Sequence, residues 1–526
     1  MMISAFYWIA LTCCCQIISG NEPVIVHTNL GDIQGYQTDM ARVFYGIPFA
    51  QPPVDTLRWQ PPVPIGKWAP QVLNATTPAP ACPQSPSCTP SIICPTVFSE
   101  DCLYLNVFTP LLSSLSSTAL LPVMIFITGG NFQSYFASGP VYQAERFANT
   151  NNVICVFIQY RLGILGFFAT GRGPNDIKGN YGILDQRLAI AWVKANIAAF
   201  GGNPDQITLL GQSAGAQSVA LHYVTSEMQS SFKGAIIQSS PMSIPFRTYA
   251  QYKIPGILLA KELHCGICDI TCFRRASYQD IIAAQMIINT NITSLKILLF
   301  FEPWTPVIDN SIVHGQLIDT IDKIRFPLKP LIIGTVTEEA LSYIYGAWSE
   351  PVSNILYYVL AFTAFQVNAF KTLKRFPPDK SGDQRPLLST IATEWVFACS
   401  TRVFARKTPS YSYVFGYPLD FDAWENMSYC NNHACHAVEL PFLFETAWPN
   451  TTDTGRWLSK SMATYWTNFA KTQDPNKPEI VPEEWPRTII GSEKYIYFQN
   501  PIQIEADYMK DDCDFWDTIG YKVQDF

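Results

Sequence analysis

The stretch that decides the fold is FGGNPDQITLLGQSAG, residues 200–215, which runs from a loop through an apolar segment into a Gly-x-Ser-x-Gly pattern. Residues 207–210 predict a short buried strand, and residues 216–221 predict the start of a helix. A serine between a strand and a helix, with glycines two residues before and after it, suits a sharp turn that presents the hydroxyl to a substrate carbonyl. Ser213 is therefore the candidate nucleophile.

The rest of the chain alternates apolar strands with helices. Residues 121–127 and 153–158 are apolar runs typical of fully buried strands, whereas the apolar positions of residues 185–193 recur at helical spacing. Residues 24–35 predict an antiparallel hairpin ahead of this pattern. Alternating strands and helices indicate an α/β fold, with a large, mostly parallel central sheet and helices on both faces. Ligands bind such sheets at the C-terminal strand ends, where Ser213 would lie.

Composition predicts a large globular protein. Only 15% of the 526 residues are charged and 48% are hydrophobic, which excludes a disordered chain. The net charge of −7 arises from acidic and basic residues mixed along the sequence, so nothing points to nucleic acid as a partner. No linker or internal repeat divides the chain, and we expect residues 21–526 to form a single domain.

Residues 1–20 predict a secretory signal peptide. An apolar run is followed by small residues and then by the polar start of the mature chain. The alternative, an uncleaved membrane anchor, is less favoured because the run is short and is interrupted by Gln16. Residues 516–526 are too polar for a lipid-anchor signal. We therefore expect a mature chain without a transmembrane segment, secreted or held in the lumen of the secretory or vesicular pathway.

Cysteines and glycosylation motifs agree with export. Three of the 15 cysteines lie in residues 13–15, and the 12 that remain suggest a disulfide-bonded protein in an oxidising compartment. Four Asn-x-Ser/Thr motifs behind a signal peptide predict a glycoprotein. The acceptor asparagines would be Asn74, Asn291, Asn426 and Asn450.

Two further strand ends carry candidate groups. Thr128-Gly129-Gly130-Asn131 follows the strand predicted at 121–127, and its backbone N–H groups suit an oxyanion hole completed by the N–H of Ala214. An ordinary glycine turn is the alternative. Glu338 and Glu339 follow the apolar run 330–334, so one of them is a candidate acid, although a surface glutamate would look the same.

A general base must come from six histidines. In hydrolases with this nucleophile turn the chain order is nucleophile, acid, base, and only His433 and His436 follow the candidate acid. Order alone does not choose between them.

Longer motifs give the chain a family resemblance. They are FYGIPFA at 44–50, EDCLYLNV at 100–107, NYGILDQR at 180–187 and the stretch 200–215. With these motifs the chain resembles the type-B carboxylesterases, the cholinesterase-like family of the α/β-hydrolase superfamily, over nearly the whole mature sequence. The resemblance implies a serine esterase that hydrolyses carboxylic esters, such as acylglycerols or small aryl or alkyl esters, through an acyl-enzyme intermediate. No cofactor and no metal are expected.

The resemblance also implies a role for each candidate residue. Ser213 would be the nucleophile, Glu339 rather than Glu338 the acid, and His436, which precedes the family's Glu-Leu pair, the base. Ser239 would help to hold the acid. The oxyanion donors would be the N–H groups of Gly130, Asn131 and Ala214.

Cysteine pairs and ion pairs follow from the same resemblance. It implies Arg58 with Glu100 and Arg161 with Asp185 as buried ion pairs. Cys155 is expected to be a free buried thiol, and Cys268 has no clear partner. The implied disulfides are Cys82–Cys102, Cys265–Cys272 and Cys399–Cys513, with Cys88 and Cys94, and Cys430 and Cys435, as additional pairs that would close small loops.

Several positions depart from the family pattern. Gln212 stands where the family usually has a glutamate, Asn131 adds a side chain to the oxyanion loop, and Glu302 is unusual for an apolar acyl pocket. No tryptophan lies between Cys82 and Cys102, where cholinesterases bind a quaternary ammonium, so acetylcholine is disfavoured as a substrate. Two functions are therefore weighed: an ester hydrolase, and a catalytically weak or silent relative with a binding or structural role. The complete set of triad residues favours the hydrolase.

Overall fold

The computed structural model describes residues 22–111, 119–293, 301–421 and 427–522. The predicted signal peptide at 1–20 and the glycosylation motif at Asn426 lie outside these residues. Asn74, Asn291 and Asn450 are all exposed, as glycan acceptors must be. Among the described residues, no helix combines the length and the apolar character that crossing a membrane requires.

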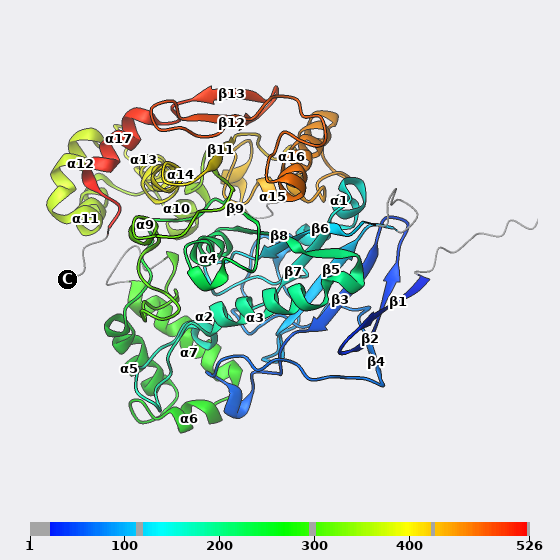
Figure 1. Cartoon of the computed structure of the whole chain (residues 1–526). Coiled ribbons are helices and arrows are strands. Elements are labelled where there is room, and N and C mark those ends of the chain that lie inside the picture. The colour runs from blue at the N-terminus through cyan, green and yellow to red at the C-terminus, as the bar shows by residue number, and fades with distance from the viewer. Residues whose placement is uncertain (1–21, 112–118, 294–300, 422–426, 523–526) are drawn as a thin grey trace, which may run out of the picture.

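One sheet of thirteen strands runs through the described part of the chain (Figure 1). Its order is β1-β2-β3-β5-β7-β6-β8-β9-β10-β11-β12-β13, and β4 pairs with β2. The strands are β1 (Glu22–Thr28), β2 (Gly31–Gln37), β3 (Arg42–Pro48), β4 (Val72–Asn74), β5 (Tyr104–Thr109), β6 (Leu121–Ile127), β7 (Ile154–Ile158), β8 (Gly202–Gln212), β9 (Gly234–Gln238), β10 (Leu331–Val336), β11 (Ser410–Phe415), β12 (Lys494–Phe498) and β13 (Gln503–Ala506).

The centre of the sheet is parallel and its edges are antiparallel. From β7 through β6, β8, β9, β10 and β11 to β12, every neighbouring pair is parallel. The hairpin β1–β2 and the pair β12–β13 are antiparallel. The predicted mostly parallel sheet and the predicted N-terminal hairpin are therefore confirmed.

Helices cover both faces of this sheet (Figure 1). The helices are α1 (Glu145–Asn151), α2 (Gly163–Phe167), α3 (Tyr181–Asn196), α4 (Ala214–Tyr223), α5 (Lys253–Glu262), α6 (Ile270–Arg275), α7 (Tyr278–Thr293), α9 (Leu317–Ile321), α10 (Leu341–Ala347), α11 (Asn354–Phe365), α12 (Ala369–Arg375), α13 (Arg385–Ala392), α14 (Cys399–Ala405), α15 (Glu439–Leu443), α16 (Asp453–Thr472) and α17 (Lys510–Ile519).

Alternate side chains of the central strands pack into two hydrophobic cores, one on each face of the sheet. Val123 and Ile125 of β6 pack in one core with residues of α3 and α4, whereas Met124 and Phe126 pack in the other with residues of α15 and α16. Successive side chains of a strand point to opposite faces, so a strand made only of apolar residues contributes side chains to both cores. The continuous apolar runs in the sequence are explained by this double burial.

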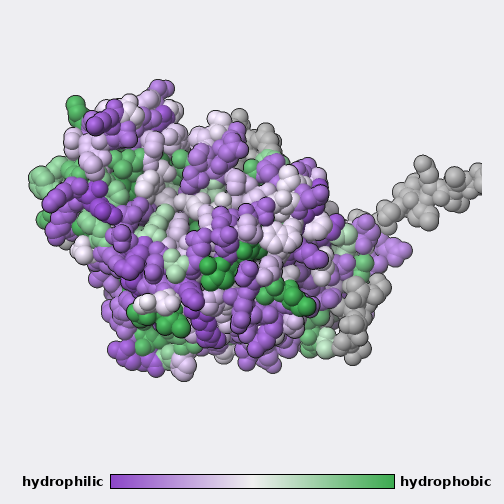
Figure 2. All heavy atoms as spheres, turned by 90° about the horizontal axis from the view of Figure 1, so that it is seen from above, coloured by the Kyte–Doolittle hydropathy of each residue, from purple (hydrophilic) through white to green (hydrophobic). Residues whose placement is uncertain are grey.

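A third, smaller core lies at the end of the molecule that carries α11, α12 and α17 (Figure 1). Trp395, Phe397 and Trp516 pack there beside the Cys399–Cys513 disulfide. The face shown in Figure 2 is mainly hydrophilic, and apolar side chains gather near this end. The exposed apolar residues of α11 and α12 include Ile355, Val359, Phe362 and Phe370.

Disulfides and buried ion pairs cross-link the chain, some within short loops and some between distant segments. Arg161 Nε is 2.8 Å from Asp185 Oδ2, and Arg58 pairs with Glu100 at a site almost closed to solvent. Cys155 is a free buried thiol and Cys268 a free exposed one. The disulfides are Cys82–Cys102, Cys88–Cys94, Cys265–Cys272, Cys399–Cys513 and Cys430–Cys435.

Candidate active site

Ser213 occupies a sharp turn between β8 and α4. Its backbone has φ 59° and ψ −127°, a conformation that side-chain-bearing residues rarely adopt. The turn is held from both sides, because Ser213 N–H donates to the Gln238 carbonyl at 3.0 Å and the Ser213 carbonyl accepts from Gln217 N–H at 2.9 Å. The hydroxyl-bearing residue is thereby fixed at the C-terminal end of a central parallel strand.

The two glycines of the pattern are required by close backbone contacts. A Cβ at position 211 would lie 2.4 Å from the carbonyl oxygen of Gly215, and a Cβ at position 215 would lie 2.0 Å from that of Ile127. Neither distance is compatible with a side chain. Glycine is therefore required at positions 211 and 215, because the turn at Ser213 packs closely on itself and against the neighbouring strand β6.

Glu339 and His436 form a buried pair beside this turn. Glu339 follows β10 and is fully buried, its Oε1 accepts from Val336 N–H at 2.9 Å, and its Oε2 lies 2.5 Å from Nδ1 of His436. An ionised carboxylate only accepts hydrogen bonds, so Nδ1 carries the proton and Nε2 is left as an acceptor. This is the tautomer that a general base needs.

The expected help from Ser239 is wrong. Its hydroxyl is buried and has no hydrogen-bond partner within the described residues. The second oxygen of Glu339 is satisfied by the backbone N–H of Val336 instead. The carboxylate is therefore held by a backbone donor at one oxygen and by His436 at the other.

A second buried carboxyl group, that of Glu439, lies near Glu339 and differs from it in charge. Burial, and then the charge of Glu339, raise the pKa of Glu439 to about 8. Glu439 is therefore mostly protonated at neutral pH, and its Oε1 lies 3.2 Å from the Gln238 amide that donates to it. The charge that faces His436 is then the one on Glu339.

His433 makes a second glutamate–histidine pair. Its Nδ1 is 2.6 Å from Oε1 of Glu338, and both side chains are partly exposed. Glu338 Oε2 also accepts from the backbone N–H of Ala434 at 3.0 Å. Of the two histidines that chain order left open, His436 is the one that lines a cavity with Ser213.

That cavity has a volume of about 150 Å³. Gly130 and Asn131, in the loop after β6, both have left-handed backbones, with φ 98° and 54°. Ala214 is buried as the first residue of α4. The cavity is lined by Ser213, His436, Gly130, Asn131, Gln212, Tyr135, Tyr142, Tyr343, Pro90, Ile93, Ser342, Met427, Cys430, Cys435, Ala437 and Leu440.

Comparison with known proteins decides the family. Residues 22–516 match the model described as "Carboxylesterase family". The chain belongs to this family. Among its relatives, the cAMP-regulated D2 protein of Dictyostelium discoideum is 34% identical, over 96% of this chain and 95% of that protein. The acetylcholinesterase of Bungarus fasciatus is 29% identical, over 97% of this chain and 89% of that protein.

Other relatives extend the likeness in sequence and in structure. The Crystal protein of D. discoideum is 33% identical, over 93% of this chain and 90% of that protein. Among solved structures, a PNB esterase superposes with a TM-score of 0.80 at 28% identity, over 94% of this chain and 99% of its own. The α/β-hydrolase fold of a carboxylesterase is thus shown for the whole described sheet.

Tyr343 is a site residue that the sequence analysis missed. It lies on α10, its hydroxyl is 3.4 Å from Asn131 Oδ1, and its ring centroid is 5.2 Å from that of His436. Burial raises the pKa of Tyr343, and a hydrogen bond with Ser213 acts in the opposite direction. No local pattern marked this tyrosine, because its contacts with Asn131 and His436 join distant segments of the chain.

Gln212 contacts the base directly. Its Nε2 is 2.9 Å from Nε2 of His436. Because that ring nitrogen is an acceptor in the tautomer deduced above, the Gln212 amide is the donor. In this member of the carboxylesterase family an amide therefore lies against the candidate base.

Glu302 is buried but does not line the catalytic cavity. Neither of its oxygens has a hydrogen-bond partner by strict geometry, and burial raises its pKa to about 8, opposed by a hydrogen bond with Gln217. Burial therefore favours the neutral form of this carboxyl group.

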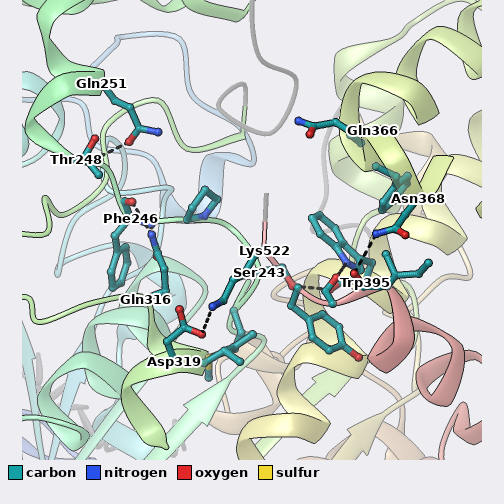
Figure 3. A pocket seen from close by; sticks show the side chains of 18 residues that line it. Ser243, Phe246, Thr248, Gln251, Gln316, Asp319, Gln366, Asn368, Trp395 and Lys522 are labelled. Carbon is teal, nitrogen blue, oxygen red and sulfur yellow. Dashed lines mark hydrogen bonds and ion pairs between the residues drawn. The ribbon is translucent and has the colours of Figure 1, made fainter. Parts of the chain in front are cut away.

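A larger cavity, of about 610 Å³, lies away from the triad (Figure 3). Its polar groups are largely paired with one another: Lys522 Nζ is 3.0 Å from Asp319 Oδ1, and the Ser243 hydroxyl donates to the Trp395 carbonyl. No triad residue lines it. No group of three potential metal ligands occurs among the described residues.

Proposed function

We propose that this chain is a secreted serine carboxylic ester hydrolase. The observation that carries the proposal is one cavity that contains Ser213 on its strained turn and His436, with Nδ1 of His436 bonded to buried Glu339. Nucleophile, base and orienting acid are the minimum set for acyl transfer through a covalent intermediate.

The reaction follows from these positions. Nε2 of His436 takes the proton of the Ser213 hydroxyl as its oxygen attacks the ester carbonyl, and Glu339 stabilises the imidazolium that forms. His436 then gives the proton to the departing alcohol, which leaves an acyl-enzyme. A water molecule, deprotonated by the same base, releases the acid. The tetrahedral oxyanion would be held by the N–H groups of Gly130, Asn131 and Ala214.

Cavity size and lining favour a small ester with an uncharged alcohol. About 150 Å³ accommodates a short acyl group with a compact leaving group, and the walls include three tyrosines and several apolar residues. No tryptophan lies between Cys82 and Cys102 to hold a quaternary ammonium. Short-chain aryl and alkyl esters are therefore the proposed substrates, and acetylcholine is not.

Disulfides and glycosylation motifs support export of this protein. The described residues form five disulfides, and such bonds are typical of proteins that mature in an oxidising compartment. Three described acceptor asparagines are exposed, which supports N-glycosylation at Asn74, Asn291 and Asn450. Reducing and deglycosylating the secreted protein, and measuring its mass after each step, tests both statements.

A catalytically weak relative is the second candidate. It is favoured by one observation: Nε2 of His436 is hydrogen-bonded to Gln212 rather than to the Ser213 hydroxyl. The two candidates differ in turnover and in the reactivity of the serine.

The test uses the purified full-length protein and its Ser213→Ala variant. An esterase hydrolyses p-nitrophenyl acetate and is labelled by a fluorophosphonate at Ser213, and the variant does neither. Absence of turnover and labelling in the wild type, or labelling that persists in Ser213→Ala, would refute the hydrolase and favour the second candidate.

A further inference from the structure

Two donors compete for one nitrogen in the catalytic cavity. Nδ1 of His436 donates to Glu339, so Nε2 of the neutral ring has a single lone pair. That lone pair accepts the amide N–H of Gln212 across 2.9 Å. The proposed reaction needs the same lone pair for the Ser213 proton. Gln212 and Ser213 therefore cannot both be bonded to the base.

The Ser213 hydroxyl has another neighbour in this structure. Tyr343 lines the same cavity as Ser213, and its hydroxyl donates to Asn131 Oδ1 at 3.4 Å. A separate chain of hydrogen bonds runs through Gln212, His436 and Glu339.

Gln212 is built into its place. It is the last residue of β8, pairs in register with Gln238 of β9, and is buried. A Cβ at position 129 would lie 2.8 Å from the Gln212 carbonyl oxygen and 2.9 Å from its Oε1. The amide is therefore packed against the loop that follows β6, and its N–H group is aimed at the histidine by the strand itself.

We propose that Gln212 is a positioning residue that restrains His436 in the free enzyme and yields it to Ser213 when an ester occupies the cavity. The inference rests on the proposed function, because it concerns the same base. After proton transfer, Nε2 of His436 carries a hydrogen and can only donate. The Gln212 N–H then loses its acceptor, so this contact favours the neutral ring and opposes the step in which His436 takes the serine proton.

The first experiment measures how fast a fluorophosphonate labels the full-length protein. Gln212→Met removes the competing donor and keeps a side chain of similar length, so labelling is expected to be about 2- to 10-fold faster, the factor associated with one net hydrogen bond. The matched control is Gln159→Met. Gln159 is equally buried, but its amide donates to the Cys102 carbonyl at 2.7 Å and it does not line the cavity, so its substitution is expected to leave the rate unchanged within about twofold.

A second variant tests whether Gln212 acts through its hydrogen bond to His436 or only by filling space. Gln212→Glu keeps the shape of the side chain, cannot donate as a carboxylate, and favours the protonated ring. Its labelling-rate profile should therefore have an acid limb at higher pH than that of the wild type. The titratable groups packed around the base, Glu339, Glu439 and Tyr343, are the same in both proteins. A glutamine that merely fills space predicts no such displacement.

The outcomes are distinguishable. A folded Gln212→Met labelled no faster than wild type overturns the inference, as does a Gln212→Glu profile that coincides with the wild-type profile. In both cases a labelled, active wild type leaves the esterase proposal intact. A wild type that is neither labelled nor active refutes the esterase proposal, and the inference is refuted with it.

Discussion

Ser213 and His436 are held in place by different means. The serine sits at the end of β8 in the middle of the sheet, where backbone hydrogen bonds and two close-packed glycines define its position. The histidine lies in the segment between β11 and α15, where a short backbone bridge between Glu338 and Cys435 is supplemented by side-chain contacts. These contacts are the Cys430–Cys435 disulfide, the pair Glu338–His433 and the hydrogen bond between Glu339 and His436.

The difference shows how a sheet and a loop solve the same problem. A central parallel strand fixes a residue through its neighbours on both sides, so the nucleophile is as rigid as the core. The loop that carries His436 has fewer backbone partners, so a disulfide and side-chain pairs also help to hold the histidine in position. Damage to the backbone packing around Ser213 should therefore cost stability, whereas damage to the cross-links around His436 should cost mainly activity.

The largest effect is expected from Ser213→Ala. Loss of the nucleophile should lower kcat for p-nitrophenyl acetate by about 10⁴- to 10⁶-fold, while the loss of one hydroxyl should change the melting temperature little. Turnover and thermal unfolding are measured on the same preparation. Retention of a tenth of the wild-type activity would contradict the assignment of this serine.

Gly215→Ala tests the backbone packing on the serine side. The added Cβ would meet the Ile127 carbonyl oxygen at 2.0 Å, and overpacking of this kind costs about 1–3 kcal/mol. Urea unfolding should show the loss. Gly382→Ala is a poor control because of its positive φ, whereas Gly66→Ala, with open space around its position, should unfold like the wild type.

The double variant Cys430→Ser, Cys435→Ser tests the cross-link on the histidine side. Without the disulfide the segment that carries His436 is less ordered, and kcat is expected to fall about 10- to 100-fold, the cost of a catalytic group displaced by about an ångström. The comparison variant is Cys265→Ser, Cys272→Ser, which opens a loop of similar size away from the cavity. Equal activities of the two variants would remove the distinction between loop and sheet.

The smallest effect on activity is expected from Glu302→Gln, which instead changes how stability depends on pH. The folded pKa of Glu302 is raised to about 8, above its unfolded value, so the folded protein binds this proton more tightly and loses stability as pH rises from about 4.5 to 8. A glutamine at position 302 does not titrate. Relative to the wild type, the variant should therefore gain about 3–4 kcal/mol of stability between pH 5 and pH 8. Parallel urea curves at pH 5 and pH 8 measure it, and a constant difference would show that Glu302 does not titrate there.

The sequence predicted the serine side in more detail than the histidine side. The turn pattern lies within five residues, Gly211 to Gly215, and the apolar runs on either side of it predict the strand and the helix. Chain order did not distinguish His433 from His436, and only the family resemblance chose His436. In the structure each histidine lies at hydrogen-bond distance from a glutamate, and position relative to Ser213 tells the two apart.

What the sequence by itself determined was the architecture: an α/β sheet with a serine at a strand end, a carboxylate after a later strand, and cysteines in sufficient number to cross-link the loops. Local patterns are enough for this, because burial on two faces and backbone contact at glycines act over a few residues. What only the tertiary structure decided was the state of the base. Gln212 and His436 are 224 positions apart, and Tyr343 reaches Asn131 from 212 positions away. Contacts between single side chains on different elements depend on how those elements pack, which no local pattern encodes.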